Sequence, residues 1–359
     1  MTAFQVRRVR GMTLVESRRP RPHLAPEVAQ QLPPHRPHPE CTALTEARGA
    51  LLYWDVLDRS PHPDAEIHDE ALAADWLWEI YGPDAADAIL HASDSIATEW
   101  ESPVLDAARR LAHLRWAEAW WPSSHAAAIP ALDTGLLRAE AAWRTAAVEH
   151  LLDDEEAVER ALAEADATAA EALDPALGAS ELTAALEDLA EDYGVALRRE
   201  PVHLRQEDWA LAAGGDRAVD FALASGGAPV DWTQVPQGLV DAAAGAAWTL
   251  TQREGGLTIT VTVPAAPEAR DLHLTARIGG VELPLILDPE TRSYSGETEA
   301  PQALLLLPAD RRVLHVFAPD FSVGDERNDP RRSPHRAEII EFARERLTDP
   351  AASLAERAA

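Results

Sequence analysis

Between about residue 42 and residue 200, hydrophobic side chains recur at the spacing of an α-helix. In the stretch that begins at Pro103, one face of such a helix would carry Leu105, Ala108, Ala112, Trp116 and Trp120. Asp133 is placed to cap the start of the following helix, and Gly194 is placed to end a later one that begins near Ser180. The pattern predicts an acidic, Ala-rich helical bundle or array over residues 42–200.

After Pro201 the hydrophobic period changes from that of a helix to that of a strand, with apolar and polar residues alternating. Pairs of glycines at Gly255-Gly256 and Gly279-Gly280 stand where short turns are needed. This spacing predicts an antiparallel, β-sandwich-like domain over residues 201–324. The expected strands are Trp209–Leu211, Val219–Leu223, Trp248–Thr251, Leu257–Val263, Leu272–Ile278, Val281–Leu287, Ser293–Glu297, Leu304–Leu307 and Val313–Phe317.

The two ends of the chain lack the size and pattern of a domain. Residues 1–41 are rich in Arg and Pro, and this composition predicts a disordered tail. Residues 325–359 are expected to hold a linker, a short helix over Ala337–Leu347 and a small polar tail. The predicted fold class is therefore α+β with two domains, the helical one first, the β-sandwich-like one second and a short helix last.

Charge restricts the possible partners. The chain has 32 basic and 61 acidic residues, a net charge of −29. Such a charge repels phosphate backbones and anionic membrane surfaces, so we expect neither nucleic acid nor membrane as a partner. Every basic residue is Arg. The absence of Lys excludes Schiff-base chemistry and a Walker A site, and the Ala, Arg and Pro bias is typical of a GC-rich bacterial genome.

Cysteine and hydropathy point to the cytoplasm. Cys41 is the single cysteine, so no intramolecular disulfide and no multi-cysteine metal site can form. No run of 18 apolar residues is present that would cross a membrane as a helix. The expected location is cytoplasmic.

Metal and cofactor sites are not expected. His35, His38 and Cys41 have a spacing at which imidazole and thiolate groups could converge on zinc. The prolines between them hold that stretch extended and spread the side chains apart. No metal and no cofactor is therefore predicted.

Catalytic motifs are also missing. The chain contains no H-E-x-x-H, G-x-S-x-G or G-x-G-x-x-G pattern. A dispersed Ser-His-Asp arrangement stays open, because its members can be far apart in sequence. A buried pair of His and carboxylate would favour it, and the candidates are His113, His150, His273 and His315.

The strongest candidate for a binding surface is acidic. Residues 133–200 hold 18 acidic residues and five Arg, a net charge of −13. The run Asp153, Asp154, Glu155 and Glu156 is its densest part, and it is assigned as a protein-binding site for a basic partner. Trp121 lies about 100° around the helix from Trp120 and is assigned to the same role as a partly exposed anchor.

These features favour a non-catalytic protein-binding or adaptor protein, an accessory subunit of a bacterial multi-protein system. Two alternatives remain. The first is an enzyme with a dispersed hydrolase-like site. The second is a small-molecule binder that uses the helical region, where eight of the 11 Trp residues lie.

Overall fold

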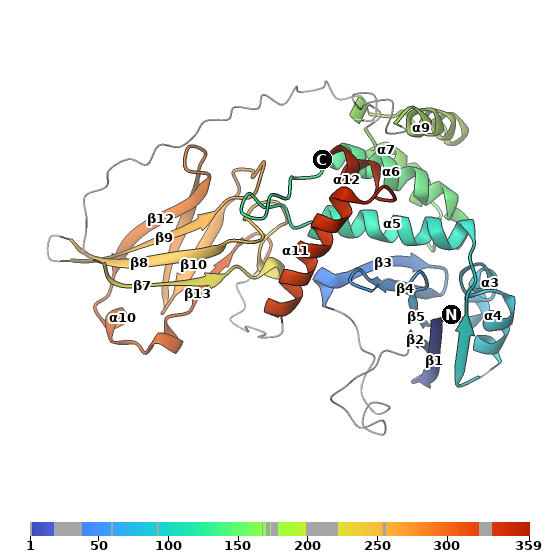
Figure 1. The fold of residues 1–359 in the computed structure, drawn as a ribbon, viewed down its shortest axis with the longest axis horizontal. Helices are drawn as coiled ribbons and strands as arrows, with labels where there is room; N and C mark the ends of the chain where they lie inside the picture. Colours follow the sequence, from blue (N-terminus) through green and yellow to red (C-terminus); the bar gives the residue numbers. More distant parts are fainter. Residues whose placement is uncertain are drawn as a thin grey trace. The chain divides into compact units, whose positions relative to one another are not determined.

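The computed structural model describes residues 2–17, 38–58, 60–91, 93–166, 168–169, 173, 179–198, 222–253, 256–322 and 332–359. It is an α+β protein with helices and two antiparallel sheets (Figure 1). The chain forms two compact units, each assembled from separate segments. Unit 1 comprises Met1–Glu118, Asp133–Val202 and Leu347–Ala358, and unit 2 comprises Ala119–Leu132 and His203–Arg346.

Unit 1 is built on a six-stranded antiparallel sheet with strand order β3-β4-β5-β2-β1-β6. The sheet buries an apolar face that includes Phe4, Leu14, Leu52 and Ile67. The strands are β1 (Thr2–Val9), β2 (Met12–Ser17), β3 (Thr42–Ala47), β4 (Ala50–Asp55), β5 (Asp64–Ile67) and β6 (Ser95–Thr98).

The N-terminal residues form part of this sheet, so the prediction of a disordered tail over residues 1–41 was wrong for residues 2–17. It was also wrong for residues 38–41, where Pro39–Cys41 form a 3-10 turn that buries Glu40 and Cys41. Strands β1 and β2 form a hairpin closed by Arg10 and Gly11, both with positive φ, as a two-residue type I′ turn requires. The basic residues of β1 are accommodated by pairing. Arg7 donates to Glu16 on the neighbouring strand, and Arg8 donates to the Ile89 carbonyl oxygen. Residues 18–37, which hold six of the seven prolines between residues 1 and 41, lie outside the described residues.

The prediction of a helical region over residues 42–200 was wrong at its start. Where the structure describes residues 42–67, they form strands β3, β4 and β5 and no helix longer than a turn. Gly49 makes the β3–β4 turn possible. Its φ is +75°, and a Cβ added there would lie 2.5 Å from the backbone oxygen of Asp69. The burial pattern of β3 alternates, with Ala43, Thr45 and Ala47 inward, but alanines carry too little hydrophobic contrast to reveal that period in the sequence.

The helical part of unit 1 agrees better with the predictions. Helix α5 (Pro103–Trp120) buries Leu105, Ala108, Ala112 and Trp116. The Asp133 side chain caps the next helix by accepting a hydrogen bond from the Leu136 amide at 2.9 Å. In the view of Figure 1, α5 runs beside the sheet, and α6, α7 and α9 lie on the side of α5 away from the sheet. The other helices of unit 1 are α2 (Glu70–Ala73), α3 (Leu77–Tyr81), α4 (Pro83–Leu90), α6 (Thr134–Ala147), α7 (Ala157–Glu164), α9 (Ala179–Tyr193) and α12 (Leu354–Ala358), with 3-10 turns at Pro39–Cys41 and Glu149–Leu151.

Unit 2 contains a seven-stranded antiparallel sheet with strand order β13-β10-β11-β12-β9-β8-β7. The sheet curls so strongly that edge strand β13 approaches β7 and β8 at the other edge, close to a barrel. The strands are β7 (Ala222–Pro229), β8 (Gly245–Arg253), β9 (Gly256–Pro264), β10 (Leu274–Ile278), β11 (Val281–Asp288), β12 (Ser293–Ala300) and β13 (Leu314–Phe317).

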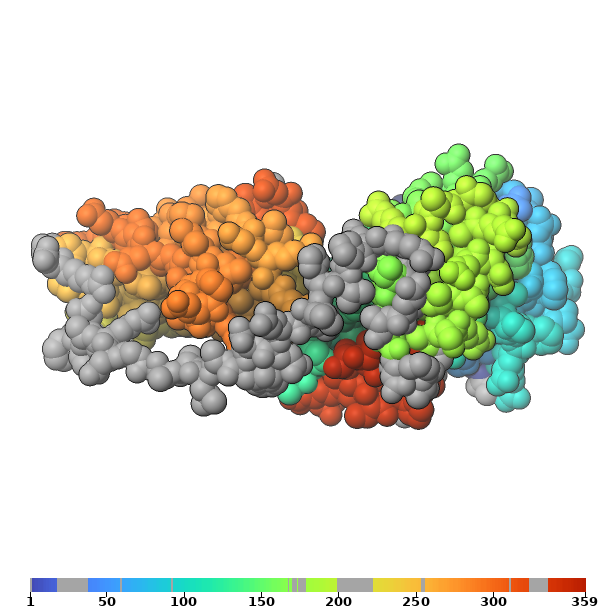
Figure 2. All heavy atoms as spheres, turned by 90° about the horizontal axis from the view of Figure 1, so that it is seen from above, coloured from blue at the N-terminus to red at the C-terminus, as the bar shows by residue number. Residues whose placement is uncertain are grey.

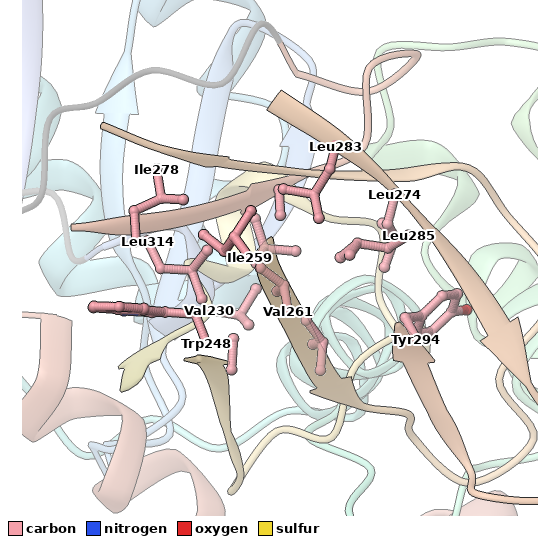
Figure 3. Close-up of a cluster of buried hydrophobic side chains, with 14 of the residues drawn as sticks. Val230, Trp248, Ile259, Val261, Leu274, Ile278, Leu283, Leu285, Tyr294 and Leu314 are labelled. Carbon is pink, nitrogen blue, oxygen red and sulfur yellow. The ribbon is translucent and has the colours of Figure 1, made fainter. Parts of the chain in front are cut away.

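The core of unit 2 fills the concave side of this sheet (Figure 3). Every second residue of β9 points inward, so Ile259, Val261 and Val263 are almost fully buried. Tyr294 is buried too, and its hydroxyl donates to the Arg270 carbonyl oxygen at 2.5 Å. The expected strands from Trp248 to Glu297 are therefore confirmed.

Of two other predictions, a strand at Leu304–Leu307 was wrong and a helix near the C-terminus is present. Leu304–Leu307 was predicted as a strand, but Ala303–Leu306 form a helical turn, α10, between Pro301 and Pro308. A four-residue apolar run has no period by which a strand and a helix can be distinguished. The helix predicted over Ala337–Leu347 is confirmed within α11 (Arg332–Thr348). The small polar tail expected after it was wrong, because Leu354–Ala358 form the further helix α12, in which Leu354, Ala355 and Glu356 are buried. The expected strands at Trp209–Leu211 and most of Val219–Leu223, and the linker start at 325–331, fall outside the described residues.

Candidate functional site

A cavity of about 320 Å³ opens on unit 1. Strand β3, helices α5, α6 and α7 and the turn before α7 surround it. Its size lies at the low end of ligand pockets, which span about 300–1,000 Å³. The cavity is lined by Glu46, Arg115, Glu118, Arg138, Ala141, Thr145, Leu152, Asp153, Asp154, Ala157, Arg160, Ala161 and Glu164.

Two of its three arginines are already paired with carboxylates. Arg138 on α6 donates to Glu118 on α5 across 2.7 Å. Arg160 on α7 is bound to Asp154, and this hydrogen bond lowers the pKa of the Asp154 carboxyl. Both pairs are partly exposed, so each adds little to stability, and their main effect is to hold charged groups in place around the opening.

The remaining charges are not balanced. Five carboxylates face three guanidinium groups, which leaves two negative charges in excess. Within the described part of the chain, the carboxylates of Glu46, Asp153 and Glu164 take part in no hydrogen bond or close ion pair. Arg115 is exposed, but the protein around it removes part of its hydration, and this desolvation lowers the pKa of its guanidinium against the opposing effect of the charges of Glu46 and Asp154.

The acidic run assigned from sequence lies at this cavity. Asp153 and Asp154 form part of its wall, and Glu155 and Glu156 follow on the exposed turn that leads into α7. Asp154 also accepts a hydrogen bond from the Glu156 amide at 3.1 Å, which shapes that turn. The structure thus brings two of the four residues to a concave site and leaves two on the surface beside it.

Trp121 does not belong to such a surface. Its side chain is only 3% exposed, and its indole nitrogen donates to the Pro130 carbonyl oxygen at 2.9 Å. The interpretation of Trp121 as a partly exposed binding anchor was wrong, because the helix ends at Trp120 and Trp121 no longer follows its periodicity.

A second, smaller pocket of unit 1 gathers polar side chains around His62. His62 is 4% exposed, and its Nε2 lies 2.8 Å from the Trp100 carbonyl oxygen. A carbonyl can only accept, so Nε2 carries the proton and Nδ1 presents a lone pair, with no hydrogen-bond partner among the described residues. Burial lowers the pKa of His62, which favours this neutral form. The lining also includes Ser17, Tyr53, Trp54, Asp55, Asp58, Ser60 and Asp64.

The second pocket is too small to hold a substrate. At about 10 Å³ it has room for about one water molecule. Ser17 Oγ is also buried without a hydrogen-bond partner in the described residues, so it does not donate to His62. A serine that is not hydrogen-bonded to the base, in a space without room for a substrate, does not make a hydrolase site.

Of the four histidines considered from sequence, His113 belongs to a buried pair with a carboxylate. Its Nε2 lies 2.9 Å from Glu356 Oε1, and its ring stacks on Trp116. The Glu356 carboxylate also accepts from the Ser353 amide and hydroxyl, while the Ser353 hydroxyl accepts from the Glu356 amide, which is a capping box. Glu356 is thus engaged in starting helix α12.

Glu140 completes this arrangement. It is 6% exposed and accepts hydrogen bonds from the Leu354 and Ala355 amides at 2.9 and 3.1 Å. Burial raises the pKa of its carboxyl, and the two amides partly offset the rise. The His113, Glu140 and Glu356 side chains therefore attach the C-terminal helix α12 within unit 1. His150 pairs with Glu79 at the surface, His273 is exposed, and His315 lies on β13 beside Arg277.

Metal ligands do not converge in the described part of the chain. No group of three His, Cys, Asp or Glu residues there is arranged to hold a metal ion. Cys41 is buried next to the first strand of the β3–β4 hairpin, and His35 lies outside the described residues. Among those residues, too, no helix combines the length and apolarity needed to cross a membrane.

Sequence reasoning missed Glu46, Arg115 and Glu164 as neighbours of the acidic run. They come from β3, α5 and α7, and nothing in the local pattern links them. The i,i+4 relation of Arg160 and Glu164 was the one detectable local signal.

Comparison with models of protein families, with curated proteins and with solved structures gives no match. The function has to be argued from the site itself.

Proposed function

We propose that this chain is a non-catalytic binding protein, an adaptor or accessory subunit that recognises a partner protein with a basic surface. One observation carries the proposal. Asp153 and Asp154 line a cavity in which five carboxylates face three arginines, and Glu155 and Glu156 lie on the exposed turn that follows them. A negative concave surface attracts cationic groups and raises their rate of encounter.

The chemistry of the described residues supports binding above catalysis. The described residues that line the larger cavity include no Ser, Cys or His, and the pKa of the Asp154 carboxyl there is lowered, the opposite of the shift that general acid–base catalysis uses. The histidine pocket is too small for a substrate. A cytoplasmic location and a role within a bacterial multi-protein system are part of the same proposal, and they rest on the composition of the sequence.

The test uses the full chain and a fluorescein-labelled oligoarginine peptide, with stopped-flow anisotropy as the readout. The association rate should fall steeply as salt rises, because exposed charges are screened over about 8 Å at physiological ionic strength. Neutralising the turn with Asp153→Asn, Asp154→Asn, Glu155→Gln and Glu156→Gln should slow association by about tenfold and leave the circular dichroism spectrum unchanged.

The matched control removes equal charge elsewhere. Glu187, Asp188, Glu191 and Asp192 are exposed on α9, which forms part of the surface in Figure 2 (yellow-green), and they do not line the cavity. Neutralising these four should have a much smaller effect on the association rate. If the two fourfold variants slow association equally, the association rate depends only on the overall charge of the chain, and the proposed site is wrong.

A further inference from the structure

We propose that the unit 1 cavity is a receptor for a single arginine side chain of the basic partner. This inference rests on the proposed function and adds the chemical group that the site selects. It follows from the two kinds of wall in the cavity, from the pairing of its charges and from its volume.

The walls match the two parts of an arginine side chain. Ala141, Leu152, Ala157 and Ala161 give apolar surface from α6, α7 and the turn before α7. Such surface accommodates the three-carbon stem of arginine, which packs on apolar groups while its head seeks polar ones. Purely acidic surface would attract any cation, but it offers no place for the stem.

The carboxylates available to the head come from different directions. Glu46 projects from β3, Asp153 from the turn before α7 and Glu164 from the end of α7. Glu118 and Asp154 are paired with Arg138 and Arg160, so these three are the cavity carboxylates without a close ion-pair partner among the described residues. A planar guanidinium has five N–H donors in a fixed fork and can serve several carboxylates at once, whereas an ammonium is a compact point charge.

Arg115 restricts which ligand groups can bind in the cavity. Its guanidinium lines the same cavity and repels a second cation close to it. A guanidinium has five N–H donors, so Arg115 suits a ligand that brings an acceptor near its cationic side chain, as a peptide carbonyl does. A cavity of about 320 Å³ with a net excess of two negative charges takes one such side chain and not a run of them.

The experiment compares three labelled peptides of one length, in which glycine alternates with arginine, lysine or the neutral analogue citrulline. Equilibrium anisotropy with the full chain should show the arginine peptide bound about tenfold more tightly than the lysine peptide, and the citrulline peptide bound least. The variant Ala161→Phe fills the cavity without changing its charge and should abolish the preference for arginine over lysine. Ala184→Phe, on the exposed side of α9, should keep it.

The possible failures are distinguishable. If both cationic peptides bind equally in a salt-dependent manner, and Ala161→Phe changes nothing, the arginine receptor is wrong while the proposed acidic binding surface stands. If no cationic peptide binds the wild-type chain, the proposed function is wrong as well. Should Ala161→Phe fail to give the wild-type circular dichroism spectrum, Ala141→Phe fills the same cavity from α6 and decides the question.

Discussion

At the scale of single residues, unit 1 retains groups whose burial has an electrostatic cost. His62 is held neutral between Phe4 and Tyr81, with its Nδ1 lone pair unsatisfied among the described residues. Glu140 is buried as an acceptor for two helix amides. Neither residue stands out in the sequence, because a lone His or Glu among ordinary neighbours carries no local sign of its burial.

His62 should make the protein sensitive to mild acid. Its folded-state pKa lies below the ordinary value of 6.5, so below pH 6.5 the unfolded chain binds the proton more readily and stability is lost as the pH falls. Above pH 6.5 the contribution of His62 is constant. The variant His62→Gln keeps a donor for the Trp100 carbonyl and removes the titration. Its melting temperature should therefore fall less than that of the wild type between pH 7 and pH 5.

The exposed His125 offers the control for this measurement. His125→Gln should follow the wild type over the same range of pH. If His62→Gln and the wild type lose stability in parallel, His62 does not titrate as its burial implies.

At the scale of secondary-structure elements, short turns decide which strands the sheet of unit 1 contains. The hairpin β1–β2 turns at Arg10-Gly11, and the hairpin β3–β4 turns at Arg48-Gly49. Both glycines have positive φ, but their surroundings differ. A Cβ at Gly11 would meet nothing within 4 Å, whereas a Cβ at Gly49 would contact the Asp69 backbone oxygen and the Leu72 side chain.

This contrast yields a paired prediction. Gly11→Ala should cost about 1–2 kcal/mol of unfolding free energy, the strain of a left-handed backbone alone. Gly49→Ala adds the collision with backbone at 2.5 Å and should cost clearly more. Urea denaturation followed by tryptophan fluorescence measures both. Equal losses in the two variants would show that the β3–β4 turn relaxes freely away from Asp69.

At the scale of the whole molecule, the net charge of −29 opposes compactness. Several described arginines, such as Arg109, Arg110 and Arg277, form ion pairs at the surface. Acidic residues outnumber basic ones by 61 to 32, so 29 carboxylates would lack an opposite charge even if every arginine paired with one.

Added salt should therefore stabilise the chain. Raising the NaCl concentration from about 0.01 M to about 0.1 M shortens the screening length from about 30 Å to about 10 Å and weakens the repulsion among carboxylates. The melting temperature should rise by a few degrees, measured by circular dichroism at constant pH. A constant or falling melting temperature would mean that the local ion pairs, which salt weakens, matter more than the net charge.

Where the hydrophobic period is long and regular, the amino-acid order alone was enough to place elements. Helices α5, α6, α9 and α11 and strands β8 to β12 follow from it, because each buries one face whatever its neighbours are. The strands β1 to β5 do not, since each has only four to eight residues and gains its stability from pairing with neighbouring strands. For the same reason, the sequence shows the acidic run but does not show the cavity beside it. Local sequence shows that Asp153 and Asp154 are charged, but Glu46, Arg115 and Glu164 reach them only when β3, α5 and α7 pack together, and that packing is a property of the tertiary structure.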